Sequence, residues 1–120
     1  MLTRRIERLS ELIQQTVSKM ILTLKDPQIG FVTITGATVT QDISLAKIFY
    51  SVLGTAEQKE ATMAALDRAR PHIRRELARL ENLRKVPELL FVYDESVERA
   101  DRVHRILETL EKERKTGDPE

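Results

Sequence analysis

The sequence predicts an α+β domain in which helices cover one face of a three-stranded sheet. Two segments, residues 31–40 and 45–53, are rich in β-branched residues and alternate apolar with polar positions, which is typical of strands. A third segment, residues 89–93, is a short apolar run that indicates a buried strand. The segments around them have helical periodicity, so one sheet and one set of helices form two layers. The 120 residues suffice for a single domain with a hydrophobic core.

A long helix is predicted over residues 4–24. Thr3 is expected to cap its start, since a threonine hydroxyl can accept a hydrogen bond from a free backbone N–H. Asp26 is expected to lie beyond its end, because the residue before Pro27 disfavours helical backbone angles. The core-facing stripe steps by three and four residues and consists of Ile6, Leu9, Ile13, Val17, Met20 and Leu24.

Residues 31–40 and 45–53 are predicted to pair as a hairpin, because only a short turn separates them. In the first strand the apolar positions change phase after Gly36, and a β-bulge there would restore the inward facing. In the second strand one face is apolar throughout and is expected to be buried. This face consists of Ala46, Ile48, Tyr50 and Val52.

The next helix is predicted over residues 56–68 and is followed by a kink at residues 69–71. Pro71 has no N–H and fits a first helical position better than a helix interior, so a second helix is expected to begin there. The stripe of this second helix consists of Ile73, Leu77 and Leu80.

After the strand at residues 89–93, Ser96 is a candidate N-cap for a last helix. That helix has an apolar stripe at Ala100, Val103, Leu107 and Leu110. The predicted organisation is therefore a domain at residues 1–95, a C-terminal helix at 96–114 and a disordered tail at 115–120.

Positive charge is concentrated in two segments, although the net charge is only +1. Residues 66–85 carry seven Lys or Arg and three acids, and residues 1–25 carry five and two. Like charges four residues apart, such as Arg75 and Arg79, cost a helix roughly 0.2–0.5 kcal/mol. The basic segments are therefore either solvated polar faces or anion-binding faces.

Several classes of protein are disfavoured. The chain has no cysteine, which excludes disulfides and thiolate metal sites. The first residues contain no apolar h-region, so a signal peptide is not expected. The sequence also has no apolar run long enough for a membrane helix and no Walker, GxGxxG, HExxH or nucleophile-elbow motif. We therefore expect a soluble cytoplasmic binding protein that is not an enzyme and needs no cofactor or metal.

Several ordered motifs resemble the bacterial ribosome-binding factor A family. They are Leu24-Lys25-Asp26-Pro27 followed by Val32-Thr33-Ile34-Thr35, the strand Ala46–Val52, Ile73-Arg74-Arg75-Glu76-Leu77, and Leu83–Phe91 (LRKVPELLF). The resemblance implies a KH-like domain of the second type, with a helix–kink–helix in place of a GxxG loop. The sequence departs from the family at Pro71, where a glycine is common, but the bend is expected to remain.

The resemblance further implies a monomeric, non-enzymatic assembly factor that binds the small ribosomal subunit. Such factors assist maturation of the 5′ region of the small-subunit rRNA, chiefly in the cold. Basic side chains would contact RNA phosphates without reading sequence. A protein–protein adaptor that uses the last helix is the alternative, and it would tolerate charge reversal at Arg74 and Arg75 but not loss of residues 96–120. The predicted RNA-binding residues are Arg4, Arg5, Arg8, Arg70, Arg74, Arg75, Arg79, Arg84 and Lys85.

Overall fold

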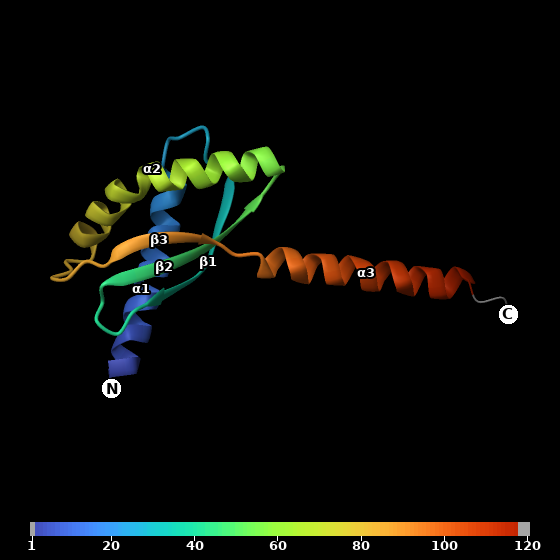
Figure 1. The fold of residues 1–120 in the computed structure, drawn as a ribbon, viewed down its shortest axis with the longest axis horizontal. Coiled ribbons are helices and arrows are strands. Elements are labelled where there is room, and N and C mark those ends of the chain that lie inside the picture. Colours follow the sequence, from blue (N-terminus) through green and yellow to red (C-terminus); the bar gives the residue numbers. More distant parts are fainter. Residues whose placement is uncertain (1, 118–120) are drawn as a thin grey trace.

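The computed structural model describes residues 2–117 and confirms the predicted α+β architecture (Figure 1). Three helices and three strands follow one another in the predicted order, except that the two helices expected around Pro71 are one. The elements are α1 (Leu2–Thr23), β1 (Phe31–Val39), β2 (Leu45–Leu53), α2 (Ala56–Leu80), β3 (Glu88–Tyr93) and α3 (Ser96–Gly117).

The three strands form one mixed sheet in the order β1-β2-β3. β1 and β2 form the predicted antiparallel hairpin, and β3 pairs with β2 in parallel. The bulge predicted near Gly36 is confirmed: Ile34 pairs with Tyr50 and Gly36 with the adjacent residue of β2, so Thr35 is the extra residue of β1. The bulge lets the apolar positions on both sides of it face the core.

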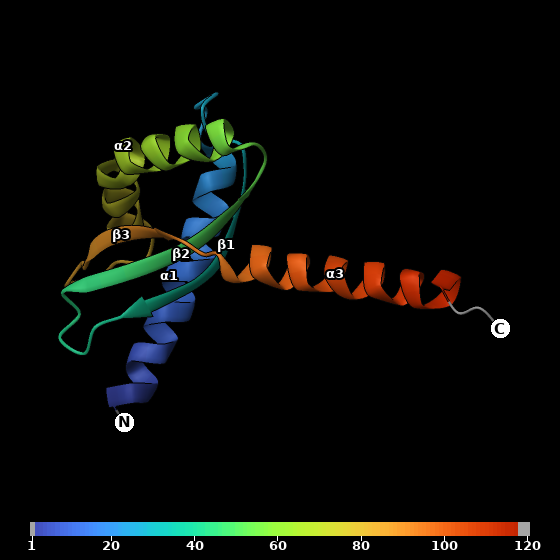
Figure 2. The same cartoon turned by 45° about the vertical axis from the view of Figure 1, so that its right-hand side comes forward.

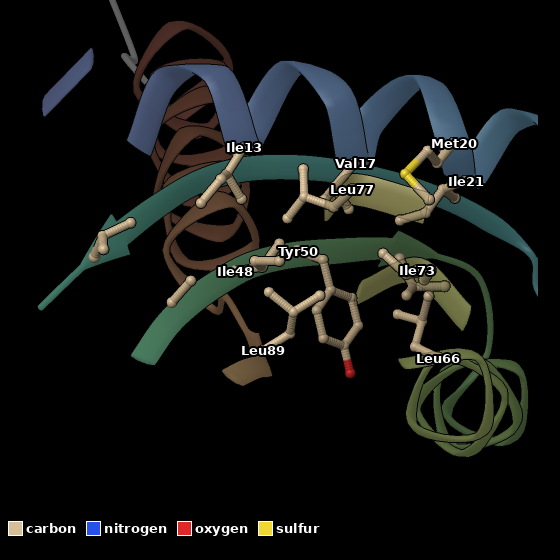
Figure 3. Close-up of a cluster of buried hydrophobic side chains, with 13 residues drawn as sticks. Ile13, Val17, Met20, Ile21, Ile48, Tyr50, Leu66, Ile73, Leu77 and Leu89 are labelled. Atoms are coloured by element: carbon tan, nitrogen blue, oxygen red, sulfur yellow. The ribbon is translucent and has the colours of Figure 1, made fainter. Parts of the chain in front are cut away.

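One hydrophobic cluster joins α1, α2 and the inner face of the sheet (Figure 3). The inward residues of β2 are buried as predicted, with Ala46 and Ile48 at 0% exposure. They meet Ile13 of α1 and Leu77 of α2, which are also fully buried. Both helices therefore cover the same face of the sheet. Truncating one of these large side chains to alanine would cost about 2–5 kcal/mol.

The predicted break at Pro71 is wrong, because α2 continues through this proline. Figure 1 shows that α2 changes direction along its length, so the expected bend is present within one helix. Pro71 removes a single backbone hydrogen bond. Buried residues on both sides of it, Leu66 and Ile73, hold the two arms on the same sheet and outweigh that loss. We call residues 69–71 the kink.

Three local expectations differ from the structure. Thr3 lies within α1 rather than ahead of it, because the helix already begins at Leu2. Leu80 is 52% exposed rather than buried; it is the last residue of α2 and lines an open groove between α1 and α2. The cap of α2, which the sequence reading overlooked, is Thr55, whose hydroxyl accepts the N–H of Gln58 while the Gln58 side chain accepts the N–H of Thr55.

The last helix projects away from the rest of the molecule, as Figures 1 and 2 both show. It begins at Ser96 as expected and continues to Gly117, beyond the predicted end at residue 114. Residues 118–120 of the predicted tail lie outside the described residues. The division of the chain into a domain, a C-terminal helix and a tail stays a prediction. Within residues 2–117, none of the helices is both long and apolar enough to cross a membrane.

Asp94 connects β1, β2 and the start of α3. Its carboxylate accepts the hydroxyl of Thr35, the bulge residue, at 2.6 Å and the backbone N–H of Ser96 at 2.9 Å. Its own N–H donates to the carbonyl of Tyr50. The direction in which α3 leaves the domain is therefore linked to the bulge in β1.

Candidate nucleic-acid interface

A groove of about 740 Å³ lies beside the bend of α2, between its second arm and the loop that leads to β3. We call it the kink groove. Four of the predicted cations line it, together with one carboxylate, so its lining is predominantly basic. The lining residues are Arg70, Pro71, Arg74, Arg75, Ala78, Arg84, Val86 and Glu88.

Arg74 fastens one wall of the kink groove to the other. Its Nε donates to the carbonyl of Pro87 at 2.9 Å, and its Nη2 donates to the carbonyl of Val86 at 2.8 Å. The same guanidinium lies 3.6 Å from the Glu88 carboxylate. The planar fork of arginine suits two such acceptors, which the ammonium of lysine does not match. Arg74 therefore shapes the groove, and only the exposed part of its side chain is left for a ligand.

The other arginines of the kink groove are less constrained. Arg70 lies 3.6 Å from Asp67 on the same helix, and its side chain is 40% exposed. Arg75 and Arg84 are exposed, and no side chain among the described residues forms a hydrogen bond or ion pair with either. Arg75 and Arg84 can therefore neutralise an anion without first losing a partner.

A second groove, of about 400 Å³, lies between the first turns of α1, the β1–β2 turn and the loop after α2. We call it the N-terminal groove. Arg84 lines both grooves, so the two are adjacent along one basic surface. The lining residues are Arg5, Arg8, Leu9, Leu12, Ile43, Asn82, Leu83, Arg84 and Lys85.

The loop after α2 is set by a helix-capping motif. Asn82 has a φ of 49°, the left-handed conformation that asparagine tolerates. The N–H of Leu83 then returns to the carbonyl of Ala78, which is the 6→1 bond of a Schellman motif. This turn directs Arg84 and Lys85 toward the two grooves.

The β1–β2 turn forms the opposite wall of the N-terminal groove. Asp42 accepts the hydroxyls of Ser44 at 2.7 Å and Thr40 at 2.8 Å. These hydrogen bonds, with a smaller contribution from the charge of Lys85, lower the pKa of Asp42 from its ordinary value of 3.8 to about 2. Lys85 Nζ donates to the Asp42 carbonyl and so ties the turn to the loop after α2.

Two predicted cations line neither groove. Arg4 is exposed on the first turns of α1. Arg79 donates a 2.7 Å hydrogen bond to Glu76, which holds the pKa of the Glu76 carboxyl below its usual value and raises the pKa of Arg79. Arg79 is 68% exposed and shares its charge with this neighbour.

Sequence reasoning missed the groove-lining residues that come from loops. Ile43 and Leu83 carry no signal in a local pattern, because the path of the two loops brings them together. A third groove, of about 420 Å³, also went unpredicted; it lies between α1 and α2 and includes Lys19, His72 and Leu80. Its lining mixes cations with the acids Glu76 and Glu81, so it is not a basic surface.

The arrangement is suited to holding a polyanion. Seven of the nine predicted cations line the two connected grooves. Within residues 2–117, no group of three His, Cys, Asp or Glu side chains is placed to hold a metal ion. Guanidinium groups contact phosphate oxygens with two parallel hydrogen bonds, and such contacts position a nucleic acid without reading its sequence.

The chain is similar to ribosome-binding factor A proteins in both sequence and fold. Ribosome-binding factor A of Geotalea daltonii is 44% identical over 108 residues, which cover 89% of this chain and 88% of that protein. The crystal structure of ribosome-binding factor A from Thermus thermophilus superposes with a TM-score of 0.66 at 23% identity, over 73% of this chain and 94% of that one.

A homology model of the Thermus thermophilus factor, fitted into a cryo-EM map of a 30S complex, gives a TM-score of 0.65 at 22% identity. It covers 75% of this chain and 96% of that one. These two likenesses show the fold, which is the expected KH-like one. The model of the protein family described as "Ribosome-binding factor A" matches residues 5–107 of this chain. With this match over most of its length and with its 44% identical relative, the chain belongs to the ribosome-binding factor A family.

Proposed function

We propose that this protein binds the small ribosomal subunit and assists maturation of the 5′ region of its rRNA. Membership of the family supports the small ribosomal subunit as the partner, because the Thermus thermophilus factor is described in a complex with 30S. The observation that carries the mode of binding is the pair of basic grooves joined at Arg84. The rRNA backbone would lie along these grooves.

The number of phosphates contacted can be estimated from the cations that have no partner. Arg5, Arg8, Arg75 and Arg84 form no ion pair with any described side chain, so each can neutralise a phosphate at no cost to an existing contact. Each neutralised phosphate contributes roughly 0.7–0.9 to the slope of log affinity against log salt. Four contacts therefore give a slope of about −3 to −4.

Co-sedimentation with purified small ribosomal subunits over a salt series tests this proposal. The wild type is compared with the double variant Arg75→Gln/Arg84→Gln. The variant is expected to fold normally and to bind with a slope shallower by about 1.4–1.8, because two phosphate contacts are lost.

A matched control is Lys25→Gln/Lys47→Gln, which removes the same charge from two exposed positions outside both grooves. The control should keep the wild-type slope. Salt-independent binding by the wild type would contradict an electrostatic interface. An equal change of slope in the double variant and the control would mean that overall charge matters and the grooves do not.

A contact between α3 and a protein is the second candidate. Four apolar side chains on one stripe of this projecting helix are more than half exposed: Val103 at 55%, Ile106 at 58%, Leu107 at 59% and Leu110 at 54%. The variant Leu107→Gln/Leu110→Gln would weaken such a contact without changing the salt slope. The salt series therefore separates the two candidates.

A further inference from the structure

The N-terminal groove combines a cationic rim with an apolar floor. Arg5, Arg8, Arg84 and Lys85 are exposed around it, and no acidic side chain lines it. We infer that this groove accepts one unstacked base of single-stranded RNA while the rim cations hold the adjoining phosphates. The inference rests on the proposed function and adds a contact with a base to the phosphate contacts. The floor consists of the half-buried side chains of Leu9, Leu12, Ile43 and Leu83.

An apolar floor favours a base over a phosphate alone. A phosphate pressed against aliphatic side chains would lose water without gaining hydrogen bonds there. A base presents a flat, weakly polar face, whose burial against such side chains is favourable. Guanidinium groups at the rim can also stack on a base plane. The volume of about 400 Å³ lies within the roughly 300–1,000 Å³ typical of small-ligand sites.

The position of the groove favours a nucleotide within a strand. Arg84 lines this groove and also the kink groove. A strand whose phosphates occupy the kink groove would therefore reach the N-terminal groove within the span of one arginine side chain. A double helix keeps its bases stacked inside, so only a single-stranded segment can place a base on the floor.

The backbone at Ile43 is a second, independent observation. Ile43 has a φ of 58°, a left-handed conformation that a β-branched residue rarely adopts. Glycine or asparagine would fit there without this strain. The strained residue is held by the hydrogen bonds of Asp42 and by Lys85. Its side chain packs partly against the core and also lines the groove. Strain of this kind is concentrated at functional sites.

The test compares two RNA probes with the full chain by fluorescence anisotropy at low salt. One probe is a labelled uridine pentanucleotide, and the other is the same strand with its central base removed. The wild type is expected to bind the complete strand about tenfold more tightly, because burial of the central base against the apolar floor is favourable. The variant Ile43→Asn should lose this difference and keep its affinity for the abasic strand, because it changes the floor and leaves all four cations in place.

The control variant is Leu22→Asn, an equivalent change at an apolar residue that is 83% exposed and lines none of the grooves. It should keep the tenfold preference. Equal binding of the two strands by the wild type would overturn the inference. So would a preference that survives in Ile43→Asn, because the base would then lie elsewhere.

A competition experiment distinguishes single-stranded RNA from other ligands of similar chemistry. If uridine monophosphate displaced the labelled pentanucleotide at concentrations similar to those of the unlabelled strand, the inference would be overturned in favour of a free nucleotide. If hexaglutamate did so, it would be overturned in favour of an acidic peptide. Failure of the wild type to sediment with small subunits would contradict the proposed function itself, whereas sedimentation without base preference would contradict only this inference.

Discussion

Arg74 and Arg75 are neighbours in the sequence, but we expect their loss to have different consequences. Arg74 makes two hydrogen bonds, at 2.9 and 2.8 Å, to the carbonyls of Pro87 and Val86. Hydrogen bonds from a charged donor contribute about 1.5–3 kcal/mol each. Because the Arg74 side chain is 38% exposed, water can replace part of each bond, and the low end of this range applies. The exposed ion pair with Glu88 adds little.

Arg74→Ala should therefore lower the free energy of unfolding by about 2–3 kcal/mol, which for a chain of this length lowers Tm by roughly 8–12 °C. Arg74→Lys should lose about half of that, because one ammonium cannot occupy both acceptors. Arg75→Ala should change stability by less than about 0.5 kcal/mol, since Arg75 is exposed and contacts no described partner.

Urea denaturation followed by circular dichroism measures these differences, and subunit co-sedimentation is measured on the same samples. We expect Arg75→Ala to bind more weakly at unchanged stability. Equal stability of Arg74→Ala and the wild type would refute the structural role of Arg74. It would leave Arg74 with only the proposed role of contacting RNA.

Three further perturbations test the loops and caps. Protonation of Asp42 should loosen the β1–β2 turn as the pH falls from about 4 to about 2, because its folded pKa of about 2 lies below its ordinary value of 3.8; amide chemical shifts of the turn should report this, and Asp42→Asn should remove the transition. Thr62→Val should cost about 1–3 kcal/mol in denaturation, because the buried hydroxyl accepts a backbone N–H at 3.1 Å and donates to a carbonyl at 3.2 Å in the loop before β1. Gly54→Ala should cost about 0.5–2 kcal/mol, because its Cβ would collide with the Gln58 amide and open the capping box of α2; an unchanged Tm would contradict this.

Local patterns predicted the sheet well because strand signals are short-range. The bounds of β2 and the bulge in β1 follow from alternation alone, since one extra residue in a strand produces the phase change seen after Gly36. The continuity of α2 could not be predicted in the same way. Pro71 alone predicts a helix break, because proline has no N–H. The helix continues because Leu66 and Ile73 are both buried in the core, and this packing is not evident from the local sequence.

The candidate site was predictable in its charge and not in its geometry. The basic segments indicated the sign of the charge at this surface, and seven of the nine cations line the two grooves, whereas Arg4 and Arg79 do not. The role of Arg74 depends on carbonyls 12 and 13 residues further along the chain, which only the path of the loop brings within reach. The left-handed conformation of Ile43 also had no local signal, since the sequence places an isoleucine where glycine or asparagine would be expected.

The extra residue of β1 lies at the base of α3, so a small change there is amplified along the helix. The hydroxyl of Thr35 donates a hydrogen bond to Asp94, which also accepts the first N–H of α3. A helix of 22 residues is roughly 33 Å long at 1.5 Å per residue. By that geometry, a rotation of about 10° at its base would move its far end by roughly 6 Å. A chain that gained or lost this bulge would therefore keep the same core and grooves while its last helix pointed in a different direction.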